Sequence, residues 1–129
     1  QVAALWPLYG TRLTVLLQST RGVSGRTIAG TPWTTPVVRW IIEHEWVTRL
    51  EDLVERRLML AFARELSIAT LNDLADVLVE AARLDEAARD AEVAACAARL
   101  QRFYGRRLVS NGMQEAQGHE IPGLPGRME

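Results

Sequence analysis

The amino-acid sequence predicts an all-α protein, a compact bundle of about five helices followed by a disordered C-terminal tail. Three observations predict this class. Apolar residues recur at intervals of three and four along most of the chain, whereas the alternation typical of strands is nearly absent. Signals that start helices precede several of these segments. With 129 residues, of which 48% are hydrophobic, the chain has the size and composition of one globular domain.

The first two helices are predicted on either side of a polar loop. We expect one helix over residues 7–18, with Pro7 at its first position, and a second over residues 36–46, with Pro36 in the same role. Residues 19–32 between them are rich in Gly, Ser and Thr, a composition typical of loops. The second helix has a broad apolar face formed by Val37, Val38, Ile41 and Ile42.

The third helix is expected to begin at a capping box. In this arrangement the Thr48 hydroxyl accepts a hydrogen bond from the amide of Glu51, and the Glu51 side chain reaches back to the start of the helix. The apolar stripe that follows runs to Ala61 and includes one charged residue, Arg57. An arginine in such a stripe is expected to meet a carboxylate from another helix.

Two further helices complete the predicted bundle. One follows a second capping signal, Thr70 to Asp73, and runs to about residue 83; the other follows Asp85 and runs to about residue 107. Residues 1–108 are therefore assigned to the helical domain and residues 109–129 to the disordered tail. The sequence starts at a glutamine rather than an initiator Met, and we interpret it as a piece of a larger protein.

Charge and composition argue against several classes of function. The net charge of −1 provides no general attraction for nucleic acid, and we expect no nucleic-acid partner. All 15 basic residues are Arg, so chemistry that requires Lys is excluded. No apolar run approaches the roughly 20 residues of a membrane span. The single Cys96, set among small apolar residues, predicts a buried, inert thiol in a reducing, cytoplasmic setting.

The sequence predicts no catalytic residue, no cofactor-binding residue and no metal ligand in this chain. His44 and His119 are the only histidines, and neither belongs to a cluster with metal-ligand spacing. The serines lack an accompanying base and acid at a recognisable spacing. The segment Gly22-Val23-Ser24-Gly25 follows no strand and does not match a dinucleotide-binding loop.

Two structural roles are predicted instead. Glu45 and Arg57 are expected to form a mostly buried ion pair that joins the second and third helices. Trp33 and Trp40 are expected to form an interface with a region outside this chain, because the second helix is apolar over more than half of its circumference. In an isolated fragment, self-association into a homodimer would cover the same surface.

The order of several motifs resembles the C-terminal helical domain of FAD-dependent, quinone-linked glycerol-3-phosphate dehydrogenases and the related alpha-glycerophosphate oxidases. The resemblance covers about residues 5–104 and departs from the family pattern at Leu8 and Leu58, where Arg and often Thr are found. The motifs that carry it are Tyr9-Gly10, Gly30-Thr31-Pro32-Trp33-Thr34, Val38-Arg39-Trp40, Glu43-His44-Glu45, the run from Thr48 to Arg57, and Ala91-Glu92-Val93.

This resemblance implies a non-catalytic cap domain. The parent enzyme would oxidise glycerol 3-phosphate to dihydroxyacetone phosphate, passing electrons to FAD and then to quinone, at the cytoplasmic face of the membrane as a peripheral protein. Its FAD and substrate would belong to an N-terminal region of the same polypeptide, the implied partner of this chain. The alternative that the residues leave open is a free-standing helical protein-interaction module.

Overall fold

The computed structural model describes residues 6–7 and 9–108, and this part of the chain is helical and contains no β-strand. The predicted all-α class is therefore confirmed, whereas the predicted tail at 109–129 lies outside the described residues. The elements are η1 (Gly10–Arg12), α2 (Leu13–Thr20), α3 (Thr35–His44), η2 (Asp52–Arg57), α4 (Ile68–Glu80), η3 (Glu86–Ala88) and α5 (Arg89–Tyr104).

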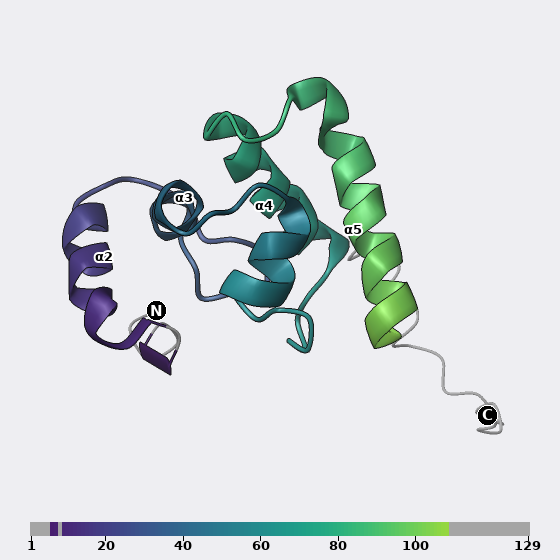
Figure 1. Ribbon diagram of the computed structural model, residues 1–129, viewed down its shortest axis with the longest axis horizontal. Helices are drawn as coiled ribbons and strands as arrows, with labels where there is room; N and C mark the ends of the chain where they lie inside the picture. Colours follow the sequence, from purple (N-terminus) through teal and green to yellow (C-terminus); the bar gives the residue numbers. More distant parts are fainter. Residues whose placement is uncertain (1–5, 8, 109–129) are drawn as a thin grey trace, which may run out of the picture.

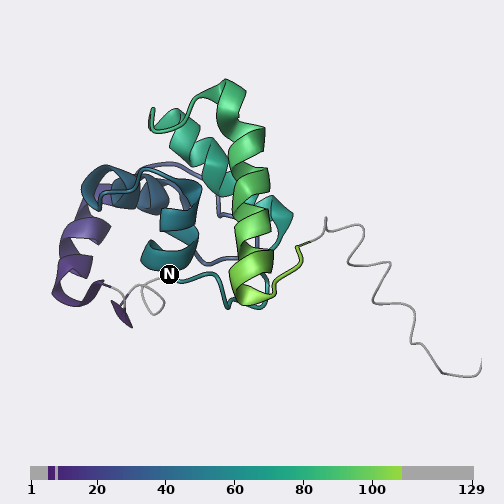
Figure 2. The same cartoon turned by 45° about the vertical axis from the view of Figure 1, so that its right-hand side comes forward.

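The helices follow one another across the molecule in chain order. Figure 1 shows α2 at one end, α3 and α4 in the middle, and the long α5 at the other end, and Figure 2 shows the same order from a second direction. Helix α2 packs on α3, α3 on α4, and α4 on α5. One core runs through all of them, and its fully buried side chains include Leu16, Ile41, Leu53, Leu74 and Leu100.

Helix starts are partly as predicted. Helix α3 begins at Thr35 with Pro36 in its first turn, as the sequence indicates. Helix α4 begins three residues earlier than the predicted signal, because Ser67 is its cap. The Ser67 hydroxyl accepts from the Thr70 amide at 3.3 Å, and the Thr70 hydroxyl accepts from the Ser67 amide at 3.2 Å.

The third helical segment is shorter than predicted and has a different geometry. Its residues Asp52–Arg57 form a π-helix, and the predicted continuation to Ala61 is wrong. The chain leaves the helix at Met59, whose φ of 53° lies in the left-handed region. Ala61 is nevertheless buried, in the loop that leads to α4.

The loop before α3 folds back on the start of α4. The amide of Ala29 donates to Asp73 Oδ2 at 2.8 Å, and the Thr70 hydroxyl donates to the Ala29 carbonyl at the same distance. Gly30 has a φ of +70°, and a Cβ there would stand 2.5 Å from the carbonyl oxygen of Glu65. Only glycine fits this position, and the turn brings Trp33 into the core.

Candidate functional site

A polar cleft of about 200 Å³ opens between the N-terminal segment, the end of α3 and the end of η2. We call it the arginine cleft, and its lining consists of Tyr9, Arg12, Glu45, Arg56 and Arg57. Three of the five side chains are guanidinium groups, and only one is a carboxylate. The cleft therefore combines positive charge with a neutral phenol on segments that are distant in the sequence.

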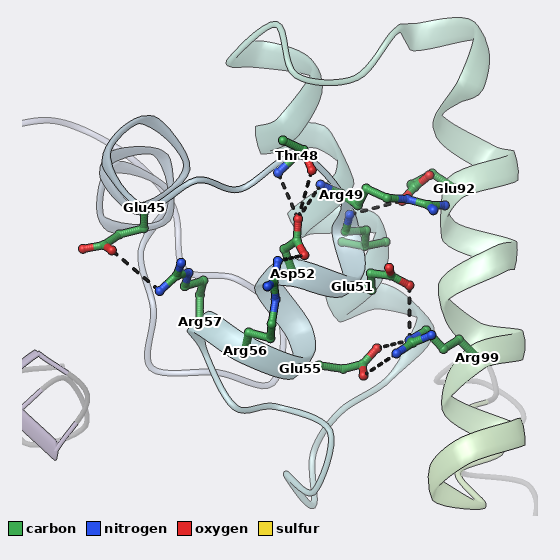
Figure 3. Close-up of polar contacts among 11 residues, drawn as sticks. Glu45, Thr48, Arg49, Glu51, Asp52, Glu55, Arg56, Arg57, Glu92 and Arg99 are labelled. Carbon is green, nitrogen blue, oxygen red and sulfur yellow. Dashed lines mark hydrogen bonds and ion pairs between the residues drawn. The ribbon is translucent and has the colours of Figure 1, made fainter.

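Glu45 lies between two of these arginines. It is the C-cap residue of α3 and is only 8% exposed. Its Oε1 is 2.5 Å from Arg12 Nη1, and its Oε2 is 3.7 Å from Arg57 Nη1. Figure 3 shows Arg57 pointing from η2 toward Glu45. The structure thus brings together the two residues that the sequence predicts as a pair, although the Arg57 side chain is 32% exposed.

Tyr9 contributes a neutral hydroxyl to the cleft. Burial, followed by the nearby negative charge of Glu45, raises the pKa of this phenol to about 12. The hydroxyl therefore stays protonated at neutral pH and can donate a hydrogen bond. No hydrogen-bond partner for Tyr9 Oη is found among the described residues.

Asp52 holds the segment that carries Arg56 and Arg57. Its Oδ2 accepts from the amides of Thr48 and Arg49, both at 3.0 Å, and from the Thr48 hydroxyl at 3.2 Å. Its other oxygen pairs with Arg56. This arrangement replaces the predicted capping box: Asp52 occupies the helix start, while Glu51 pairs with Arg99 at 3.2 Å. The cause is spacing, since Asp52 reaches both free amides at once.

The opposite side of η2 is joined to α5. Glu55 pairs with Arg99 (Figure 3), and it accepts from the Tyr104 hydroxyl at 3.0 Å. The hydrogen bond from Arg99 is the main reason why the pKa of Glu55 is lowered; burial opposes it, and the Tyr104 bond adds to it. Segment η2 is therefore fixed by polar contacts on two sides, to α3 and to α5.

Trp33 and Trp40 do not form the predicted interface. They are 3% and 7% exposed, respectively, and both belong to the chain's own core. Trp33 is buried because the 21–34 loop folds back onto α4, and Trp40 is covered by the ring of His44, stacked at 4.3 Å. The surplus apolar surface that the sequence indicates on α3 is thus used internally, and the prediction of an interface at these two residues is wrong.

Exposed large apolar residues are found elsewhere. Met59 and Phe62 in the loop after η2 are 54% and 75% exposed, and Phe103 in the last turn of α5 is 59% exposed. We call these three residues, of which Phe62 and Phe103 are aromatic, the aromatic face. The two segments touch, because the rings of Phe62 and Tyr104 form a T-shaped pair with their centroids 5.2 Å apart and Arg106 donates to the Ala61 carbonyl. Trp46, exposed by 88%, lies apart from them and lines a second cleft of about 480 Å³.

The described residues include no cluster of candidate metal ligands, and the one cysteine is buried. Within residues 6–7 and 9–108, no group of three or more His, Cys, Asp or Glu side chains is arranged to hold a metal ion. Cys96 is buried and free of a disulfide, and burial raises the pKa of its thiol to about 12. The predicted buried thiol is therefore found, and it stays protonated at neutral pH.

Arg12 and Tyr9 are the cleft residues that sequence reasoning missed. Both precede α2, more than thirty positions before Glu45, and no periodic pattern links the two regions. The one signal for them in the sequence was Glu45 itself, since a buried carboxylate usually has more than one hydrogen-bond or ion-pair partner.

The described helices include none that is both long and apolar enough to cross a membrane.

Comparison with known proteins adds no relative. No family model matches the chain, and neither the curated proteins nor the solved structures contain a match to it.

Proposed function

We propose that the chain is a non-catalytic helical cap domain of an FAD-dependent glycerol-3-phosphate dehydrogenase. Two observations support this proposal: the ordered series of motifs that resembles this family, and the aromatic face of Met59, Phe62 and Phe103. The parent enzyme would convert glycerol 3-phosphate to dihydroxyacetone phosphate and pass electrons to FAD and then quinone. Its FAD and substrate would be held by an N-terminal region of the same polypeptide. The whole enzyme would be a peripheral protein at the cytoplasmic face of the membrane.

The aromatic face is the observation that carries the docking role. A contiguous patch of exposed apolar side chains is typical of a contact surface, and the Phe62–Tyr104 contact brings the loop that carries Met59 and Phe62 against the last turn of α5, which carries Phe103. Phe62 is held by Tyr104, whose hydroxyl is fixed by Glu55. Phe103 lies under two guanidinium groups, those of Arg99 at 4.9 Å and Arg102 at 5.2 Å. The face is therefore organised on the folded domain rather than on a loose end.

The test is a docking experiment with two polypeptides. The reading frame that contains this chain is expressed in two parts, this chain and the region upstream of Gln1 with an affinity tag. We expect the upstream part to retain the chain, and the Phe62→Ser variant to be lost from it. Val15→Ser is the matched control, since Val15 is 56% exposed on α2, at the other end of the molecule. Equal retention of both variants would contradict a docking role for the aromatic face.

The second candidate, a free-standing helical interaction module, uses the same aromatic face with a separate protein as its partner. The two candidates differ in the gene. The cap-domain proposal requires a strand–GxGxxG–helix unit encoded upstream in the same reading frame. A reading frame that begins next to this chain would favour the free-standing module and would overturn the cap-domain proposal.

A further inference from the structure

Among the clefts and charged clusters of the described residues, the arginine cleft is the one that contains buried donors without a partner. Three guanidinium groups line it, and the two carboxylates in contact with them, Glu45 and Asp52, leave one positive charge in excess. Each guanidinium carries five N–H donors, so the pairing with Glu45 and Asp52 occupies only part of the donor capacity. The side chains of Arg12 and Arg56 are 57% and 62% exposed, so water can satisfy their remaining donors, whereas the buried Nε–H of Arg57 has no partner among the described residues.

Unsatisfied donors are concentrated at this place. Within residues 6–7 and 9–108, four buried side-chain atoms lack a hydrogen-bond partner, and three of them belong to this cleft: Tyr9 Oη, Arg57 Nε and Glu45 Oε1. Glu45 Oε1 has its ion pair with Arg12, so the groups that lack any acceptor are Tyr9 O–H and Arg57 Nε–H. Buried donors in folded proteins are nearly always paired with protein, water or a ligand, because leaving them unpaired is costly.

The backbone geometry at Arg56 and Arg57 also favours a functional site in the arginine cleft. Arg56 and Arg57 end a π-helical segment, a geometry that is rare and frequently found at functional sites. Asp52 fixes the start of the segment, and Glu45 holds Arg57 and Arg12 from a buried position. The arginines are therefore positioned by carboxylates behind them, which is how a preorganised anion site is built.

We propose that the arginine cleft binds a small phosphate-type dianion, either inorganic phosphate or a compact phosphate monoester. Four donor groups face the cleft, from Tyr9, Arg12, Arg56 and Arg57. A tetrahedral phosphate offers enough acceptor oxygens for all of them, whereas a carboxylate offers only two oxygens in one plane. The volume of about 200 Å³ suits a small ion rather than a nucleotide. This site does not depend on the cap-domain proposal.

The experiment is a titration of the purified chain with sodium phosphate at constant ionic strength, using sodium chloride as the balancing salt. Binding is followed by calorimetry and by the thermal midpoint. At a phosphate concentration of ten times Kd, mass action predicts a rise of about 5 °C in Tm. The Tyr9→Phe variant removes one hydroxyl donor to a charged ligand, and we expect its Kd to be about tenfold weaker. Arg57→Gln is expected to abolish the effect.

Two controls keep the result interpretable. Tyr9→Phe removes a buried donor that has no partner, so its stability without phosphate is expected to equal or exceed that of the parent chain. Arg39→Gln alters an exposed pair with Glu43, on α3 but outside the cleft, and is expected to keep the phosphate response. Loss of phosphate binding without loss of folding is the pattern that supports the proposal.

Three results would overturn it. Phosphate and chloride could give the same midpoints at equal ionic strength, which would show that water alone fills the cleft. A phosphate response could persist in Arg57→Gln and Tyr9→Phe, which would place the binding elsewhere. Finally, the chain could bind vesicles that contain phosphatidic acid yet show no response to inorganic phosphate, which would identify a lipid surface rather than a free dianion as the ligand.

Discussion

Replacing Asp52 with alanine removes the carboxylate that starts η2 and positions Arg56 and Arg57. Asp52 is 7% exposed, and its oxygens accept from two backbone amides, one hydroxyl and one guanidinium. The two amide bonds to a charged acceptor are each expected to contribute about 1.5 kcal/mol. Arg56 adds no more than about 0.5 kcal/mol, because its side chain is 62% exposed and its pairing is screened by solvent. The Thr48 hydroxyl can turn to water.

We therefore expect Asp52→Ala to lower the free energy of unfolding by about 3 kcal/mol, measured by urea denaturation at pH 7. Glu43→Ala is the matched control. Glu43 also forms a pair with an arginine four positions away, Arg39, but the side chains of this pair are 43% and 48% exposed. Its loss is expected to cost about 0.3 kcal/mol. Equal effects of the two substitutions would refute the argument that Asp52 acts as a buried cap.

Three further predictions follow from the helix ends, the carboxylates and the aromatic face. Ala82 is exposed and its φ is +58°, so Ala82→Gly is expected to raise the free energy of unfolding by about 1 kcal/mol. Ala94→Gly, at an exposed position inside α5, is expected to lower it by about the same amount. A lower free energy of unfolding in both variants would contradict the strain argument. Burial alone raises the pKa of Asp52, but its hydrogen bonds outweigh this effect and lower it, and the pKa of Glu55 is lowered by Arg99. The stability that both carboxylates contribute is thus complete above their ordinary pKa of about 4 and is lost as the pH falls through their lower folded pKa values. Urea midpoints measured from pH 7 to pH 2 should therefore stay level to about pH 4.5 and then fall. The fall should be less steep in Asp52→Ala than in the parent chain. Sedimentation over a concentration series should show self-association that Phe62→Ser weakens, and a parent chain that stays monomeric at every concentration would argue against an exposed docking face.

The sequence predicts α2, α3, α4 and α5 approximately, because apolar residues at helical spacing mark each of them. The apolar spacing and Pro36 predict α3 closely, whereas the predicted capping signal before α4, from Thr70 to Asp73, is wrong: Ser67 and Thr70 form the capping box, and Asp73 accepts from the amide of Ala29. Ser and Thr are both good cap residues, and only the tertiary contact of Thr70 with Ala29 decides between them. The π-helical turn in η2 has no such signal, because its apolar pattern is also compatible with an α-helix.

The spacing of apolar residues shows that α3 is apolar over more than half of its circumference, but it does not show which part of the protein covers that surface. For this reason the sequence predicts Trp40 at an external interface, whereas in the fold the His44 ring stacks on it and the Arg12 guanidinium lies 5.9 Å from its ring centroid. The same limit explains the candidate site. The sequence predicts Glu45 and Arg57 as a pair because an arginine in an apolar stripe is expected to meet a carboxylate from another helix, whereas Arg12 reaches Glu45 only once α2 packs on α3.

The most direct test of the proposed function is the absorbance spectrum of the polypeptide encoded by the whole reading frame that contains this chain. The cap-domain account predicts an oxidised flavin spectrum that bleaches when glycerol 3-phosphate is added without oxygen, because substrate oxidation reduces the FAD. This chain purified alone is the control, and it is expected to carry no flavin. A full-length polypeptide with no flavin, or with a flavin that glycerol 3-phosphate leaves oxidised, would contradict the account.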